Sequence, residues 1–83
     1  MFIHLGNEMV VNEKDIIGIF DLETTTVSKH TRKFLEVAEK QKQVINVSYE
    51  LPKSFIVTNE NGKEKVYISQ ISTVTLQKRS NIL

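Results

Sequence analysis

The chain has 83 residues, of which 40% are hydrophobic and 25% charged, and it contains no cysteine. A chain of this length and composition is expected to fold as one domain, residues 1–83, with a single small core. Without cysteine, disulfides, thiolate catalysis and cysteine-based zinc sites are excluded. Eleven Lys and Arg against ten Asp and Glu give a net charge of +1, which argues against a net basic field that attracts nucleic acid or anionic lipid.

The charges are distributed unevenly. Residues 1–28 sum to −4, residues 29–42 to +3, residues 43–64 to −1 and residues 65–83 to +3. An oligomer could therefore display a basic surface that the total conceals. The first residues lack a basic segment followed by an apolar one, and no apolar run approaches the ~18 residues of a membrane span. We therefore expect a cytoplasmic protein without a membrane segment.

Three short apolar runs open the chain and predict strands at Phe2–Leu5, Met9–Val11 and Ile16–Leu22, joined by turn-forming residues. In the third run both the odd and the even positions are apolar, and in a strand these point to opposite faces. The run therefore predicts a strand covered on both faces, by a helix on one side and by another subunit on the other. Gly18 in its interior predicts a bulge or the close approach of another backbone.

A change of period after this run predicts an amphipathic helix from Ser28, as a capping residue, to about Gln43. Val44–Tyr49 alternates and predicts a strand, which the segment Leu51–Lys53 with its proline interrupts. Ser54–Thr58 and Lys65–Ser69 flank Asn61-Gly62, the strongest short signal for a hairpin. The tail from Ser72 to Arg79 predicts a short capped helix. The predicted class is α+β, a small, mostly antiparallel sheet of five to six short strands with one amphipathic helix and a short C-terminal helix.

The sequence offers little for catalysis. The two histidines, His4 and His30, lie far apart, and a lone strand histidine is usually a packed residue. No glycine-rich nucleotide-binding motif occurs. Two pairs of acids would share a strand face, namely Glu13 with Asp15 and Asp21 with Glu23. Such acids usually solvate a strand end, so we predict no catalytic residue, no metal, no cofactor and no small-molecule substrate.

Three segments carry a resemblance to a known family: Ile3–Gly6, Val10–Asp21 and Pro52–Thr58. They resemble the extracellular matrix regulatory protein B (RemB, YaaB-type) family of spore-forming Gram-positive bacteria, and the resemblance extends to about Arg79. This family is a sister of the RemA group, small proteins that resemble DNA-binding response-regulator domains, assemble into rings and activate transcription of biofilm matrix operons. The resemblance implies a small β-rich domain with one main helix, in a ring-shaped homo-oligomer that acts near DNA.

Two departures from the RemA pattern bear on DNA binding. The arginine pair that follows a tyrosine in that pattern falls on Leu51 and Pro52, after Tyr49. A further arginine falls on Asp15, with Lys14 beside it. Both departures remove phosphate contacts. The resemblance therefore supports the ring-forming fold more strongly than it supports DNA binding, because that fold depends on the apolar strands.

Two functions remain open. The first is a cytoplasmic, non-enzymatic regulator of matrix gene expression that binds DNA phosphates as a homo-oligomer, in which weak patches add up. Its candidate contacts are Lys14, Lys29, Arg32, Lys33, Lys53, Lys78 and Arg79. The second is an oligomeric interaction module that modulates a DNA-binding relative without contacting DNA. Its candidate interface residues are Ile16, Ile17, Gly18, Ile19 and Phe20. An RNA-binding sheet is less favoured, because exposed aromatic pairs at strand spacing are missing.

Overall fold

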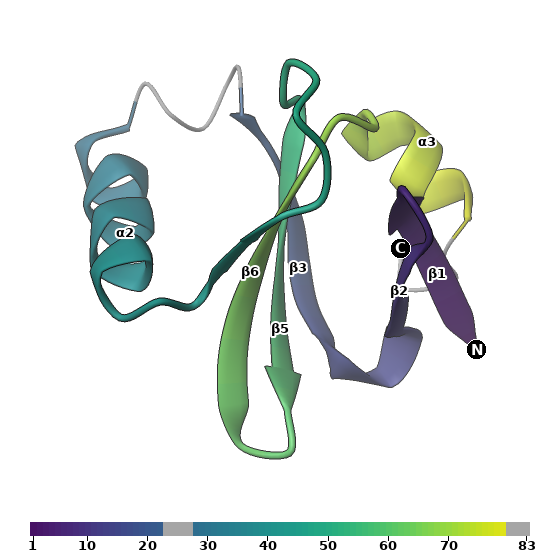
Figure 1. Cartoon of the computed structure of the whole chain (residues 1–83), viewed down its shortest axis with the longest axis horizontal. Helices are drawn as coiled ribbons and strands as arrows, with labels where there is room; N and C mark the ends of the chain where they lie inside the picture. Colours follow the sequence, from purple (N-terminus) through teal and green to yellow (C-terminus); the bar gives the residue numbers. More distant parts are fainter. Residues whose placement is uncertain (23–27, 80–83) are drawn as a thin grey trace.

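The protein has three layers, seen edge-on in Figure 1, with a four-stranded sheet in the middle. The computed structural model describes residues 1–22 and 28–79. Helix α2 (Lys29–Lys40) lies on one side of the sheet, and a two-stranded hairpin with helix α3 (Thr73–Lys78) lies on the other. The hairpin consists of β1 (Phe2–Gly6) and β2 (Met9–Asn12), and the four-stranded sheet has the order β3 (Ile16–Asp21), β5 (Ser54–Glu60), β6 (Lys63–Ser69) and β4 (Val44–Asn46). The predicted α+β class is confirmed.

The β1–β2 hairpin turns through Asn7 and Glu8, which both have positive φ angles. The Asn7 side-chain amide donates a hydrogen bond of 3.0 Å to the carbonyl of Val47, which fixes the turn against the segment after β4. A 3₁₀ turn, η1 (Glu13–Asp15), then leads into β3, and the Asn12 side chain accepts a bond of 3.0 Å from the backbone N–H of Lys14. The three predicted N-terminal strands are thus present.

Strand β3 lies at an edge of the sheet and pairs antiparallel with β5. The register shifts between Ile16 and Gly18, so the predicted bulge is confirmed. The neighbouring hairpin β5–β6 is also confirmed, with strands longer than expected and a two-residue turn at Asn61 and Gly62. Their φ angles of 55° and 84° are those that a tight hairpin turn requires at both positions.

Two boundaries differ from the prediction. Helix α2 ends at Lys40 rather than near Gln43, because Lys42 adopts a φ of 60° and turns the chain into β4. Ser28 is the N-cap residue of α2 as predicted, but the predicted capping bond is wrong, since its side chain accepts no capping hydrogen bond. Strand β4 ends at Asn46 rather than at Tyr49. It pairs parallel with β6 at the sheet edge, and the chain must then pass the end of β6 to reach β5.

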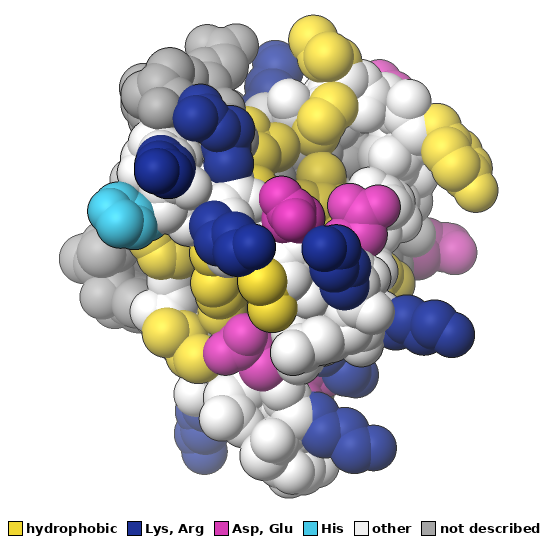
Figure 2. Space-filling model, turned by 90° about the vertical axis from the view of Figure 1, so that its left-hand side faces the viewer, with side chains coloured by type: hydrophobic (Ala, Val, Ile, Leu, Met, Phe, Trp, Pro, Cys, Tyr) yellow, Lys and Arg dark blue, Asp and Glu magenta, His cyan; other side chains and the backbone are white. Residues whose placement is uncertain are grey.

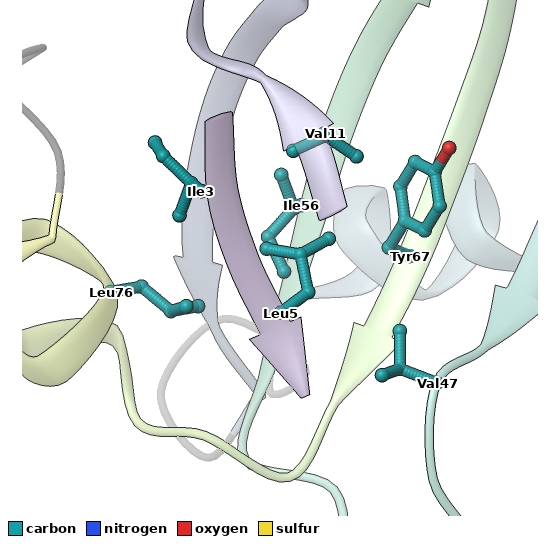
Figure 3. Close-up of a cluster of buried hydrophobic side chains, with 7 residues drawn as sticks. All are labelled: Ile3, Leu5, Val11, Val47, Ile56, Tyr67 and Leu76. Carbon is teal, nitrogen blue, oxygen red and sulfur yellow. The ribbon is translucent and has the colours of Figure 1, made fainter. Parts of the chain in front are cut away.

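The main core lies between the sheet and the layer formed by the hairpin and α3. It contains seven buried side chains, shown in Figure 3: Ile3, Leu5, Val11, Val47, Ile56, Tyr67 and Leu76. The Ser69 hydroxyl donates a bond of 2.7 Å to the carbonyl of Leu5, and the Ser72 side chain caps α3 as predicted by accepting a bond from the N–H of Thr75. A second, smaller cluster lies under α2 and contains Ala38, Phe55, Val57 and Val66.

Candidate functional site

The five candidate interface residues of β3 fall on two different faces of the sheet. Ile16 and Ile19 are half-buried and pack against the main core. Ile17 and Phe20 belong to the α2 side and are 61% and 39% exposed. A helix, α3, thus covers one face of this strand as expected, and the coverage of the other face by another subunit stays a prediction. One face is covered by the hairpin and α3 rather than by the long helix, and the other is open.

An open groove lies between α2 and the β3 edge, with a volume of about 370 Å³. We call it the apolar groove, and its lining consists of Ile17, Phe20, Phe34, Phe55 and Val57 with the polar residues His30, Thr31 and Glu64. The ring of Phe55 forms its floor, stacked on Phe20 at 4.9 Å and tilted toward Phe34 at 6.5 Å between ring centroids. A Cβ at Gly18 would come within 2.6 Å of the Phe20 ring, so glycine at the bulge lets this ring lie over the strand.

The groove stays open because α2 leans toward the other half of the sheet. Ala38 is the only buried residue of the helix, and Leu35 packs with Val44 from β4 at the second cluster. Phe34 and Val37 belong to the apolar side of the same helix, yet they remain 36% and 39% exposed. Exposed large side chains that gather next to one another usually mark a contact surface.

Three of the candidate bases lie on the N-terminal half of α2, and all three are exposed: Lys29, Arg32 and Lys33. Figure 2 looks onto this side of the molecule and shows basic side chains beside apolar ones that reach the surface. Glu36 lies 3.9 Å from Lys33 and 3.4 Å from Lys40. Ion pairs this exposed contribute little energy, so they do not prevent these bases from meeting a phosphate.

The other candidate bases lie elsewhere. Lys53 directly precedes β5, where its N–H donates to the carbonyl of Ser69 at 2.8 Å and its side chain is exposed. Lys14 lies at the opposite end of the sheet, because β3 begins beside Thr58 and ends beside Ser54. The two lysines are therefore not brought together within one chain.

The last two candidates, Lys78 and Arg79, belong to the end of α3, across the sheet from α2. The Arg79 guanidinium donates a hydrogen bond of 3.0 Å to the carbonyl of His4 in β1, so it also fastens α3 to the hairpin. The seven candidate bases thus form no continuous surface on one chain, and only the group on α2 is a true cluster.

A second group of lysines was not singled out from the sequence. Lys42, Lys63 and Lys65 line a polar hollow of about 410 Å³ at the tip of the β5–β6 hairpin. Lys65 is paired with Glu60 at 3.2 Å. The lysines meet because β4 and β6 pair in parallel, with Val44 opposite Val66. No local pattern predicts this pairing, so only knowledge of the sheet order could have found the group.

One partly buried polar network lies in the same hairpin and centres on Glu60. Its carboxylate accepts hydrogen bonds from Thr58 and Tyr67, both 2.7 Å, and from Lys65. Burial raises the pKa of Glu60, but these three bonds and the Lys65 charge outweigh it and leave the pKa below its ordinary value. Burial and the bond to Glu60 raise the pKa of Tyr67 well above its ordinary value. Thr58, Lys65 and Tyr67 each donate a hydrogen bond to the Glu60 carboxylate. The network therefore links β5 to β6 and holds the hairpin together.

A surface loop links β4 to β5, and we call its five central residues, 48–52, the arch. The chain is fastened to β6 on both sides of the arch, since the N–H of Val47 donates to Ile68 at 2.9 Å and that of Lys53 to Ser69 at 2.8 Å. At the crest Tyr49 is fully exposed and Leu51 is 80% exposed. The arch thus presents apolar side chains where the RemA pattern implies arginines.

Within residues 1–22 and 28–79, no group of three His, Cys, Asp or Glu is arranged to hold a metal ion. In the same part of the chain no helix has the length and apolarity needed to cross a membrane.

The fold and its surface define the class, a small α+β protein with an open apolar groove, a projecting arch and a basic helix. The sequence matches the RemA-like family, described as extracellular matrix regulatory protein A-like, over residues 2–79, and the chain belongs to this family. It is 40% identical over 83 residues to the extracellular matrix regulatory protein B of Bacillus subtilis (strain 168), and the alignment covers 100% of this chain and 94% of that protein. The resemblance found in the sequence is thereby confirmed.

Proposed function

We propose that this chain is a cytoplasmic, non-enzymatic regulator of extracellular matrix (biofilm) gene expression that acts as a homo-oligomer and contacts DNA through its phosphates. The observation that carries the proposal is the similarity, over the full length, to a protein named for the regulation of extracellular matrix. A net charge of only +1 fits an oligomer better than a monomer, because repeated weak patches gain affinity by acting together.

The N-terminal half of α2 is the best-supported phosphate contact. Lys29, Arg32 and Lys33 are exposed within little more than one helical turn. Their spacing suits contacts with neighbouring phosphates along one strand of DNA, which position a protein without reading its sequence. In an oligomer, one such helix from each copy would contact the duplex.

A second candidate function is supported by the arch. Leu51 and Pro52 stand where the RemA pattern has its arginine pair, and Leu51 is exposed. An exposed apolar loop suits a protein partner rather than a phosphate. In this alternative the oligomer modulates a DNA-binding relative and makes no DNA contact itself.

Band shifts with duplex DNA over a range of salt concentrations separate the two functions. The variant Lys29→Gln/Arg32→Gln/Lys33→Gln is compared with a control that removes three positive charges elsewhere, Lys40→Gln/Lys42→Gln/Lys63→Gln. If the proposal is right, the first variant weakens binding, and the slope of log affinity against log salt falls by about 0.9 for each phosphate that is no longer neutralised. The control keeps most of the slope.

Equal weakening in both variants would show that binding follows total charge and not α2. A wild-type protein that retains no duplex even at low salt would overturn DNA contact and leave the interaction module as the function.

A further inference from the structure

We propose that the apolar groove of one copy of this chain receives the arch of the next copy, so that the subunits join head to tail. The inference rests on the homo-oligomer of the proposed function and assigns its contact surfaces. The occupant is a second copy because one chain supplies both halves of the contact, a concave apolar site and a convex apolar loop.

The groove has the properties of a site for side chains. Three aromatic rings, from Phe20, Phe34 and Phe55, line a volume of about 370 Å³, near the lower end of the ~300–1,000 Å³ range of binding pockets. Its lining is mainly apolar, and its polar members are His30 and Thr31 from α2 and Glu64 from β6, whereas a small-molecule site needs several polar groups placed to orient the ligand. A leucine and a tyrosine from a protein loop need no such groups.

The arch has the properties of the inserting element. Its crest places Tyr49 and Leu51 in solvent, while the flanking backbone is bonded to β6 and the N–H of Glu50 donates to the Ser48 hydroxyl at 3.0 Å. A loop that is already ordered loses little entropy on binding. Tyrosine is also among the residues that contribute most strongly when they fill a partner's pocket.

The positions of the two elements favour repetition. The groove lies between α2 and the β3 edge of the sheet, whereas the arch runs from β4 across the end of β6 to the start of β5. None of the residues that line the groove belongs to the arch. One contact therefore leaves a groove free on one subunit and an arch free on the other. Such a heterologous contact generates a ring if the rotation closes and a filament if it does not.

The α2 segment beside the groove and the crest of the arch carry opposite charges, with Glu64 also lining the groove and Lys53 following the arch. The α2 segment 29–34 flanks the groove with three bases and His30 and contains no acid. The arch carries one charged residue, the acid Glu50, between its two exposed apolar side chains. Complementary charge at the rim of an apolar contact fixes orientation and excludes other partners.

Engineered cysteines test the contact against a clean background, because the native chain has none. The native mass of the wild type is measured first. Then Leu51→Cys and Ile17→Cys are introduced singly and together, since both native side chains are largely exposed and their replacement leaves the core intact. The matched control combines Leu51→Cys with Val74→Cys on α3, where the native side chain is 59% exposed.

If the inference is right, oxidation of the double variant Ile17→Cys/Leu51→Cys gives a ladder of covalent oligomers on a denaturing gel. Each single variant and the control stay predominantly monomeric. A covalent dimer from either single variant would show that like surfaces meet, which overturns the head-to-tail contact. A ladder in the control would show random collision and overturn it as well.

The native mass separates this inference from the proposed function. An oligomeric wild type whose double variant gives no ladder overturns the contact of groove and arch, while the proposed oligomeric regulator stands. A monomeric wild type overturns the oligomer itself and, with it, this contact.

Discussion

On one side of the four-stranded sheet the hairpin and α3 enclose seven buried side chains, whereas on the other side α2 leaves Phe20 and Phe34 partly in solvent. Apolar side chains face both sides of the sheet. Burial of a large apolar side chain stabilises a fold by about 1.5–3 kcal/mol, so the open side holds stabilisation that the single chain does not realise. The comparison indicates that the hairpin side supplies folding stability and that the α2 side is available for association.

Truncation of one apolar side chain on each side of the sheet tests this division of roles most strongly. Leu5→Ala removes a fully buried side chain from the main core and should lower the free energy of unfolding by about 2–5 kcal/mol, because a cavity is left behind. Val37→Ala removes an exposed side chain of α2 and should cost less than about 1 kcal/mol. Urea unfolding measures both, and equal costs would refute the division of roles.

The Glu60 network extends the comparison to polar groups and to pH. Glu60→Gln should destabilise by about 1–3 kcal/mol, because a partly buried charged acceptor of three hydrogen bonds is replaced. Since the folded-state pKa lies below the ordinary 4.5, the stabilisation is complete above about pH 4.5 and is lost as the pH falls through the folded pKa.

Unfolding free energies at neutral pH and near pH 3 measure this effect. The wild type should lose more stability on acidification than Glu60→Gln does. The control Glu36→Gln removes an exposed acid of α2 with two surface ion pairs and should change stability by less than about 1 kcal/mol. An identical acid response of wild type and Glu60→Gln would contradict the role of the network.

The Gly18→Ala variant tests how the Phe20 ring packs on the open side of the sheet. Gly18→Ala places a methyl group within 2.6 Å of the Phe20 ring, which must swing away from its stack on Phe55. Because the atoms in the way belong to the tip of a partly exposed side chain, we expect a cost of only about 1 kcal/mol, of the order of one aromatic pair. If the groove is a subunit contact, the variant should lose native mass while its free energy of unfolding changes little. An undisturbed native mass together with a large loss of stability would place Phe20 in the core instead.

The smallest expected difference concerns the two helices. The Ser72 side chain accepts a bond from the N–H of Thr75, whereas the Ser28 side chain makes no capping bond. Ser72→Ala should therefore cost about 1 kcal/mol, and Ser28→Ala should stay within about 0.5 kcal/mol of the wild type. Thermal unfolding of the two variants in parallel measures the difference, and a larger cost at Ser28 would reverse the assignment of the cap.

Local chemistry was predictable from the sequence, and long-range pairing was not. The Asn61-Gly62 turn, the Gly18 bulge and the Ser72 cap each follow from what one or two residues allow their own backbone to do. The end of β4 depends instead on its parallel pairing with β6, a strand that lies beyond the arch and all of β5 along the chain.

The candidate site shows the same limit. The exposed bases of α2 follow from helical periodicity, but the separation of Lys14 from Lys53 depends on the register of β3 with β5. The apolar pattern of β3 correctly marks an unusual strand. It does not say that Ile16 and Ile19 complete the core while Ile17 and Phe20 stay open, because the bulge shifts which residues share a face.

The bonds that fasten β1 also constrain when this protein can fold. The carbonyls of His4 and Leu5 are held by Arg79 and Ser69, 75 and 64 positions further along the chain. During synthesis the first hairpin leaves the ribosome well before these partners exist, and contacts of such long separation form slowly. The main core can therefore close only after α3 has emerged, so the nascent chain must keep its earliest apolar strands from aggregating until the residues of α3 have been made.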